Sequence, residues 1–195
     1  MTGIWFTSDL HISHRFVAGL RGFDDVEAHD AQLAANWDKV IRPVDQVWML
    51  GDVCGTRGTE AAALEWVSQR PGIKHLIAGN HDGCHPMHHE AHKVQRAYLE
   101  VFASVQQSAI RKISGQRVLL SHFPYGSPGG DHTDVIRYPE WRFPNDGRWL
   151  IHGHTHSNIQ QRGRQLHVGL DAHDLRPVPL RWIEDRIAEG IQEAA

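Results

Sequence analysis

The stretch Gly79-Asn80-His81-Asp82 decides how the rest of this chain is interpreted. It follows the apolar run at 75–78, so we expect a loop that leaves the end of a buried strand. A Gly-Asn pair at that point favours a sharp turn of the backbone. The turn then presents an amide, an imidazole and a carboxylate in succession, which are side chains of metal sites and of acid–base catalysis.

Four more polar clusters follow other apolar runs. They are Asp9-Leu10-His11 after the run at 4–6, Gly51-Asp52 after 47–50, His122 after 118–120, and Gly153-His154-Thr155-His156 after 149–151. Each run is short enough to be a buried strand. Five strand ends that carry His, Asp or Asn can converge on one edge of a sheet, so the sequence predicts one shared polar site there.

Apolar runs alternate with helical patterns in the first part of the chain. Strands are predicted at 4–8, 44–50 and 75–78. A helix at 26–41 follows the capping residues Asp24 and Asp25, and a second helix at 61–68 follows Thr59. This order of strand, helix, strand, helix and strand is typical of a parallel sheet covered by helices.

The later part of the chain has a mixed pattern. We expect a helix at 88–101, a hairpin formed by 109–113 and 118–121, strands at 149–151 and 166–170, and a helix at 182–191. Pro177 and Pro179 are expected to end the sheet region. His88 and His92 lie four residues apart, but Lys93 breaks an HExxH pattern, so a solvated helix face is expected.

Composition limits the classes of protein that remain. The 195 residues show no repeat or linker, which predicts a single domain over 1–195. The net charge of -3 argues against a nucleic-acid binder and a polybasic membrane anchor. No apolar run approaches the ~20 residues of a membrane span, so a cytoplasmic protein is expected. Cys54 and Cys84 are expected to be loop thiols, whereas the 16 dispersed histidines point to metal.

The polar clusters contain a mixed set of donors. Imidazole and carboxylate ligands suit first-row transition metals such as Mn²⁺, Fe²⁺, Zn²⁺, Ni²⁺ or Co²⁺, whereas Mg²⁺ and Ca²⁺ prefer all-oxygen sites. The set is too large for one tetrahedral ion and is sufficient for two divalent ions that share a carboxylate. Such a pair of ions can hold both the attacking and the leaving oxygen when a phosphoryl group is displaced in line. The candidate metal ligands are Asp9, His11, Asp52, Asn80, His122, His154 and His156.

The order of these clusters resembles the calcineurin-like metallophosphoesterase family, in the form of its small bacterial and phage members. The matching blocks span 9–156 and therefore most of the chain. The resemblance implies an α/β fold, a four-layer α/β/β/α sandwich of two mixed β-sheets flanked by helices. One position departs from the pattern: many members have a second Asp three residues after the bridging one, where this chain has Gly55.

The resemblance also implies a role for each matching residue. The first ion would be held by Asp9, His11, Asp52 and His156, and the second by Asp52, Asn80, His122 and His154. Manganese is the first choice of metal. A hydroxide that bridges the two ions would attack phosphorus in line. His81 would then protonate the leaving-group oxygen, and Asp82 would orient the His81 ring.

The segment 123–147 is long, irregular and attached to His122. Loops of this length are usually functional or disordered, and the attachment to His122 favours function and a place beside the ions. Its aromatic rings would stack on a base or an aryl group, and its arginines would meet phosphate. Packing of the rings onto the sheet explains them equally well. The candidate substrate-binding residues are Arg15, Phe123, Tyr125 and Arg137.

We therefore predict that the chain is a phosphodiesterase. Its substrates would be small phosphoesters, such as 2′,3′-cyclic nucleotides or aryl phosphodiesters. The alternatives are a phosphomonoesterase acting on nucleotides or proteins, a nuclease, and a metal-binding module without hydrolysis. The negative net charge disfavours stable binding of nucleic acid. A binding module would not need an acid such as His81 beside the metals. The physiological substrate, the native metal and the oligomeric state stay open.

Overall fold

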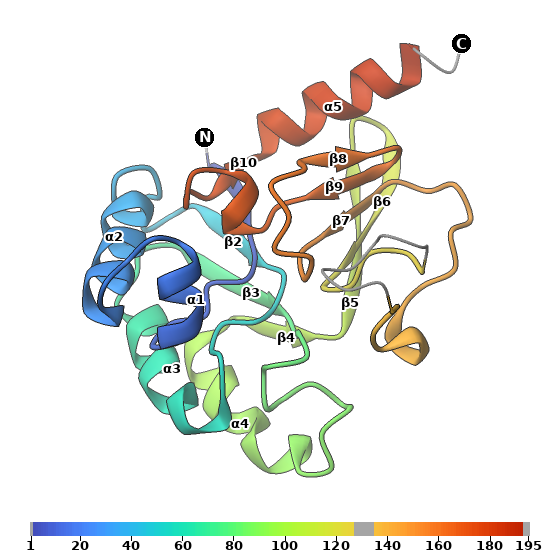
Figure 1. Ribbon diagram of the computed structural model, residues 1–195. Coiled ribbons are helices and arrows are strands. Elements are labelled where there is room, and N and C mark those ends of the chain that lie inside the picture. The colour runs from blue at the N-terminus through green and yellow to red at the C-terminus, as the bar shows by residue number, and fades with distance from the viewer. Residues whose placement is uncertain (1, 127–134, 193–195) are drawn as a thin grey trace.

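The computed structural model describes residues 2–126 and 135–192, and its strands form two mixed β-sheets (Figure 1). In the first sheet, with the order β10-β1-β2-β3-β4, β10 is antiparallel to β1 and the other neighbours run parallel. Its strands are β1 (Ile4–Thr7), β2 (Gln46–Met49), β3 (Ile73–Ile77), β4 (Ser104–Gln106) and β10 (Val178–Pro179).

The second sheet has the order β5-β6-β7-β9-β8. Its two central pairings are parallel and its two outer pairings are antiparallel. The predicted hairpin is the β5–β6 pair. The strands are β5 (Ser108–Ile113), β6 (Gln116–Ser121), β7 (Leu150–His152), β8 (Gln161–Arg162) and β9 (Gln165–His167).

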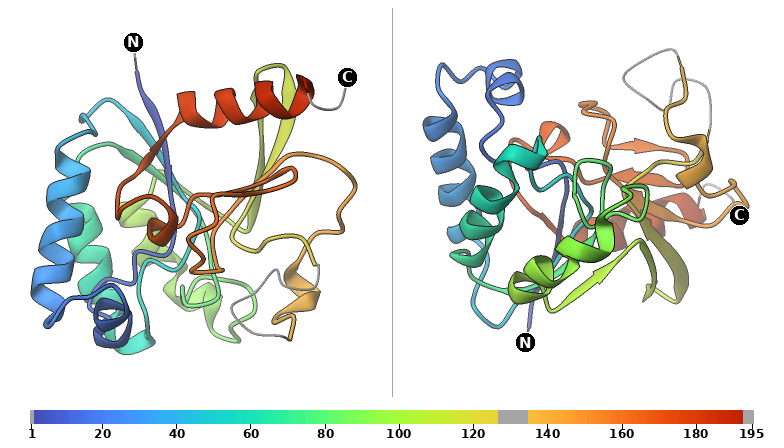
Figure 2. Two further views of the ribbon diagram at one scale, coloured as in Figure 1. Left: turned by 45° about the horizontal axis from the view of Figure 1, so that its top comes forward. Right: turned by 90° about the horizontal axis from the view of Figure 1, so that it is seen from below.

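Three helices cover the outer face of the first sheet (Figures 1 and 2). They are α2 (Val26–Asp38), α3 (Glu60–Ser68) and α4 (Ala91–Val101). The Asp25 side chain caps α2 by accepting a hydrogen bond from the backbone N–H of Ala28. The remaining helical elements are α1 (Arg15–Leu20), α5 (Leu180–Gln192) and the 3₁₀ turns η1 (Arg57–Thr59), η2 (Pro139–Trp141) and η3 (Leu170–Ala172). In the described part of the chain, no helix has both the length and the apolar character of a membrane span.

Alternation along the strands divides the core into two main clusters. Val47 and Met49 of β2 pack with residues of α2, α3 and α4, whereas Trp48 between them packs with residues of the second sheet. Each fully buried side chain of this size contributes about 1.5–3 kcal/mol. Both faces of β2 are therefore covered, which fixes the direction in which Asp52 leaves the strand.

The predicted fold class is confirmed, with one difference in the outermost layer. Leu119 and Leu150 on the outer face of the second sheet pack with Tyr125 and Phe143. In the described residues this face is thus covered by the segment around η2, not by an α-helix. The C-terminal helix α5 lies across one end of both sheets and buries Ile183 and Ile187 between them (Figure 1).

Several element boundaries differ from the sequence prediction. Val178 and Pro179 do not end the sheet region but form β10, because an edge strand tolerates proline. The helix predicted at 88–101 begins at Ala91. The short elements α1, β4 and β8 were not predicted, since each has too few residues to show a period.

Candidate metal centre

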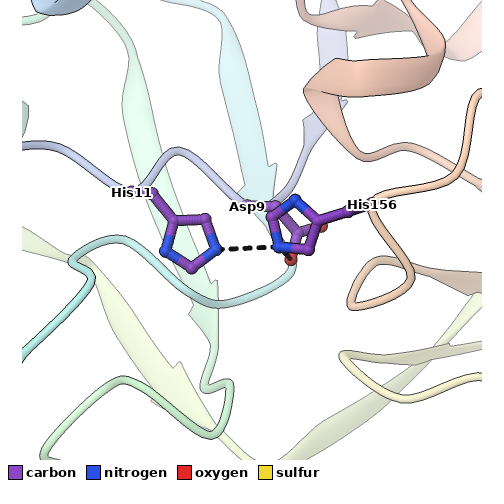
Figure 3. A group of neighbouring side chains, drawn as sticks. All are labelled: Asp9, His11 and His156. Atoms are coloured by element: carbon purple, nitrogen blue, oxygen red, sulfur yellow. Dashed lines mark hydrogen bonds and ion pairs between the residues drawn. The ribbon is translucent and has the colours of Figure 1, made fainter. Parts of the chain in front are cut away.

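Three side chains from distant parts of the chain meet beyond β1 and β7 (Figure 3). Nε2 of His11 lies 3.1 Å from Nε2 of His156, which lies 3.9 Å from Oδ1 of Asp9. Figure 3 shows the two rings pointing toward one another with the carboxylate of Asp9 beside them. One donor atom from each residue lies within 4.8 Å of the others. We call Asp9, His11 and His156 the first cluster.

A second group lies beyond β2, β3 and β6. Nε2 of His122 lies 3.1 Å from Oδ1 of Asn80 and 3.2 Å from Nδ1 of His154. The same nitrogen is 3.5 Å from Oδ2 of Asp52. All four residues are buried. We call Asp52, Asn80, His122 and His154 the second cluster.

Asp52 faces both clusters. Its Oδ2 lies 3.8 Å from Nε2 of His11 in the first cluster and 3.5 Å from Nε2 of His122 in the second. Burial raises the pKa of Asp52 to about 7. A carboxylate that is ionised in such a place needs a positive partner, and a pair of cations on either side would supply it.

The backbone at the site is strained. Asp9, His11, Asp52, His154 and His156 all have a positive φ, between 48° and 73°. Non-glycine residues adopt this left-handed region seldom, at a cost of about 1–3 kcal/mol each. Five of the seven predicted ligands share it. The surrounding fold therefore holds these residues against their own preference, which is typical of functional sites.

Two glycines let the ligand loops approach one another. Gly51 has a φ of 87°, and a Cβ there would lie 2.5 Å from the backbone nitrogen of Gly79. A Cβ on Gly79 would fall inside contact distance of the Asp52 carboxylate. Gly79 is not among the glycines with positive φ, so it is needed for close approach and not for a left-handed turn.

Comparison with known proteins places this geometry in a family. Residues 3–169 match the sequence profile of the calcineurin-like phosphoesterase superfamily domain. The chain belongs to this superfamily. It is 48% identical over 185 residues to the Gene 66 protein of Mycobacterium phage L5, covering 88% of each chain. It is 44% identical over 204 residues to the Gene 66 protein of Mycobacterium phage D29, covering 98% of this chain and all of that protein.

A solved structure shares the fold. The protein of unknown function AQ665 from Aquifex aeolicus matches with a TM-score of 0.72 and 25% sequence identity. The match covers 95% of this chain and 99% of that one. The calcineurin-like fold expected from the order of the clusters is thus present across almost the whole chain.

The donor groups fit the metal ions that calcineurin-like phosphoesterases use. Nδ1 of His122 donates to the carbonyl of Leu50 at 2.7 Å, which leaves its Nε2 as the unprotonated nitrogen facing Asn80 and His154. Burial lowers the pKa of His122 to about 4. Neutral imidazoles whose other nitrogen is hydrogen-bonded are the form in which histidine binds a metal. This calcineurin-like chain therefore has two candidate metal-binding clusters.

The first cluster depends on two residues that the sequence did not reveal. Nδ1 of His156 lies 3.0 Å from Oδ2 of Asp171. Arg21 donates from Nε and Nη2 to the two carboxylate oxygens of Asp171, at 2.8 and 2.9 Å, and from Nη2 to the backbone carbonyl of Asp9 at 2.7 Å. Arg21 and Asp171 are separated by 150 residues, so no local pattern connects them.

His81 lies beside both clusters, but Asp82 does not orient it. Nε2 of His81 is 3.9 Å from Oδ2 of Asp52, and the side chain is 37% exposed. Burial lowers the pKa of His81, and the backbone of Gly55 partly opposes that shift.

Asp82 has a different role from the predicted one. It accepts hydrogen bonds from the backbone N–H groups of Asp52, Val53 and Gly79, at 3.0, 2.9 and 2.8 Å. Burial and the charge of Asp52 raise its pKa to about 8. Asp82 therefore ties the two loops together, and the predicted contact with the His81 ring is corrected.

The predicted aromatic contacts with substrate are also corrected. Tyr125 has no exposed surface, and its hydroxyl donates to the carbonyl of Arg148 at 3.2 Å. Phe123 is 2% exposed, and its ring lies 4.9 Å from the rings of His122 and His154. Both rings are packing groups, and that of Phe123 supports the second cluster.

The two arginines predicted to bind substrate, Arg137 and Arg15, lie in different surroundings. The positive charge of Arg137 lowers the pKa of both Asp52 and His81, which places it near the site. Arg15 is exposed on α1 and lines a shallow hollow with Phe16 and Leu20. Residues 127–134, in the middle of the segment 123–147, lie outside the described residues.

His88 was expected on a solvated helix face, and the structure corrects this. The residue precedes α4, and its Nε2 donates to the backbone carbonyl of Asn80 at 2.9 Å. It thus helps to fix the loop that carries Asn80. The prediction was wrong because the spacing of His88 and His92 was interpreted as helical before the helix begins.

Proposed function

We propose that this chain is a phosphodiesterase that uses two divalent ions and acts on small phosphodiesters, such as 2′,3′-cyclic nucleotides and aryl phosphodiesters. The observation that supports it best is the place of Asp52, whose carboxylate lies within 4 Å of histidine nitrogens in both clusters. A single buried carboxylate between two sets of imidazoles is suited to two ions that share it.

The ligand sets follow the two clusters. Asp9, His11 and His156 would hold one ion, Asn80, His122 and His154 would hold the other, and Asp52 would belong to both. When bound, two such ions acidify a shared water and neutralise the charge of phosphate oxygens. Manganese, iron, zinc, nickel or cobalt would each suit these donors.

His81 is the proposed general acid. Its side chain is the partly exposed group beside Asp52, so it can reach a substrate atom that the buried ligands cannot. Nε2 of its ring lies 3.9 Å from Oδ2 of Asp52, and the ring lies 5.3 Å from that of His11, so His81 is close to ligands of both clusters. A proton given to the departing oxygen at this position would allow an alkoxide such as a ribose oxygen to leave.

The charge around the site favours a diester over a monoester. Arg137 directs positive charge toward Asp52 and His81. Arg142, the next arginine of the segment, donates to the carbonyl of Arg137 at 2.8 Å and lies over the ring of Phe123. The guanidinium of Arg137 suits the single negative charge of a diester, whereas a monoester dianion rewards several fixed cations.

The test compares two esters with the same leaving group. We expect the Mn²⁺-loaded protein to hydrolyse bis(p-nitrophenyl) phosphate with a higher kcat/KM than p-nitrophenyl phosphate. Adenosine 2′,3′-cyclic phosphate should likewise be preferred to adenosine 3′-phosphate, and a chelator should abolish both activities.

Three results would contradict the proposal. A clear preference for the monoesters would make the chain a phosphomonoesterase. Faster cleavage of a single-stranded oligonucleotide than of any small diester would make it a nuclease. Binding of metal without hydrolysis of any of these esters would leave only a metal-binding module.

A further inference from the structure

A row of aromatic rings leads outward from the first cluster along the start of α1. The ring of His14 lies 5.5 Å from the ring of His11, and the ring of Phe16 lies 6.5 Å from that of His14. Phe16 is 69% exposed and Leu20 is 70% exposed, although both are large and apolar. With Arg15 and Gly19 they line an open hollow of about 530 Å³. The row therefore ends in solvent and begins at a proposed metal ligand.

The position of His14 depends on Gly55. A Cβ on Gly55 would fall inside contact distance of two ring carbons of His14, and 2.7 Å from its Cβ. The missing side chain at 55 is thus what leaves room for the imidazole. The rings of His14 and His81 lie 5.5 and 5.3 Å from the ring of His11, so the His14 ring lies near the proposed acid.

Nδ1 of His14 is buried and has no hydrogen-bond partner among the described residues. The half-buried ring lies between a metal ligand and an exposed phenylalanine, where a flat group that enters along α1 would meet it. Stacking of bases on such side chains is tolerant of their identity and contributes about 1–3 kcal/mol per base.

We propose that His14 and Phe16 form the subsite for the aromatic group of the ester, a nucleobase or an aryl ring, next to the metal centre. This inference rests on the proposed phosphodiesterase function and names the part of the substrate that the exposed rings bind. Gly55 determines the subsite indirectly, because any side chain there displaces the imidazole.

The experiment compares two cyclic diesters that differ only outside the reacting ring. Adenosine 2′,3′-cyclic phosphate and glycerol 1,2-cyclic phosphate share the five-membered phosphodiester, but only the first has a base. In the Mn²⁺-loaded protein we expect Phe16→Ala to lower the ratio of their kcat/KM values about tenfold, which lies within the range for loss of one stacking contact. The loss should lie in KM for the adenosine ester. Leu99→Ala, which removes an apolar side chain 53% exposed on α4, is the matched control and should leave the ratio unchanged.

A double-mutant cycle tests the role of Gly55. His14→Gly removes the three atoms that lie nearest to a Cβ at 55, and glycine is accepted at the N-cap position that His14 occupies. We expect His14→Gly and Gly55→Ala each to lower the ratio, and the double variant to lower it no further than His14→Gly alone.

The outcomes separate this inference from the proposed function. One outcome is that the variants Phe16→Ala and His14→Gly hydrolyse both cyclic esters with the wild-type ratio of kcat/KM values. That result would overturn the subsite and leave the proposed phosphodiesterase function standing. Effects of His14→Gly and Gly55→Ala that multiply would overturn the role of Gly55 as a spacer. Failure of the wild-type protein to hydrolyse either cyclic ester would overturn both the function and the subsite.

Discussion

In the second cluster the ring of His122 is held by a backbone carbonyl, whereas in the first cluster the ring of His156 is held by a carboxylate. His122 is fully buried and donates to Leu50, the residue that follows β2. His156 is 26% exposed and pairs with Asp171, which Arg21 holds in turn. The arrangement around His122 needs only the sheet. The arrangement around His156 needs an ion pair between residues 150 positions apart.

The difference predicts unequal robustness of the two proposed ion sites. A backbone carbonyl in a parallel sheet cannot be removed by substitution of one side chain. The carboxylate of Asp171 can be removed in this way. Its loss would also leave the charge of Arg21, whose side chain is 4% exposed, without the carboxylate that balances it. The second cluster should therefore be the more preorganised of the two, and the first should respond to single substitutions.

The largest expected effect comes from Asp52, the residue that the two clusters share. Asp52→Asn keeps the size of the side chain but removes the charge that both ions would need. We expect metal binding to fall from two ions per chain toward none, and hydrolysis of diesters to fall with it. Elemental analysis of metal-loaded wild type and variant checks this, with circular dichroism as the control for folding. A wild-type protein that saturates at one ion would contradict the idea of a shared ligand.

His81 comes next, because it belongs to neither cluster. His81→Ala should leave both ions bound and lower the rate for poor leaving groups by ~10²–10⁴, the range for one general acid. A nitrophenolate needs little protonation, so bis(p-nitrophenyl) phosphate should lose less activity than a cyclic nucleotide. Kinetics on the two substrates, together with metal content, test the role. Equal losses on both would exclude His81 as the acid.

Asp171 tests the difference between the clusters directly. Asp171→Asn removes the charge of the group that holds a metal-binding histidine. It should weaken the binding of one ion by about 10–100-fold, the usual effect of mutating such a partner, and should leave the second ion in place. Isothermal titration with Mn²⁺ would show one weakened site. Asp174→Asn, three residues further on, is the control and should bind both ions as the wild type does. Loss of both ions in Asp171→Asn would mean that the clusters are not held independently.

The sequence predicted the parts of the molecule that local pattern determines. The central parallel strands, the β5–β6 hairpin and the clustering of polar residues at strand ends all follow from short apolar runs. The contact between Arg21 and Asp171 could not be predicted, because it joins residues that have no pattern in common. The role of Asp82 was missed for a related reason, since its partners are backbone N–H groups, which no sequence displays.

The direction of the aromatic side chains also could not be predicted from the sequence. Tyr125 and Phe123 follow His122 directly, so the sequence placed them at the site but did not reveal which way they face. The structure turns Tyr125 into the core on the outer face of the second sheet. Phe16, whose short helix was not predicted, is the ring that remains exposed.

The smallest expected effect is a difference in pH dependence between the two proposed sites. Burial lowers the pKa of His156, but its hydrogen bond to Asp171 and the charges of Asp9 and Asp171 outweigh burial and leave the pKa above the ordinary value of 6.5. Burial lowers the pKa of His122 to about 4. A metal ligand must be deprotonated, so each histidine weakens binding once the pH falls below its own pKa, by about tenfold per unit.

As the pH falls, the first cluster should therefore begin to lose affinity at a pH above 6.5, while the imidazole of His122 stays neutral until about pH 4. Protonation of the shared Asp52, with a pKa of about 7, would weaken the binding of both ions alike. It therefore does not cancel the difference in pH dependence between the two sites. Titrations with Mn²⁺ at pH 8, 7 and 6 should show one site weakening faster than the other. Because Asp171→Asn removes the negative charge that helps to raise the pKa of His156 and leaves at most a neutral hydrogen bond, its weaker site should depend less on pH than in the wild type. Two sites that weaken in parallel in the wild type would mean that Asp52 alone governs proton competition at this centre.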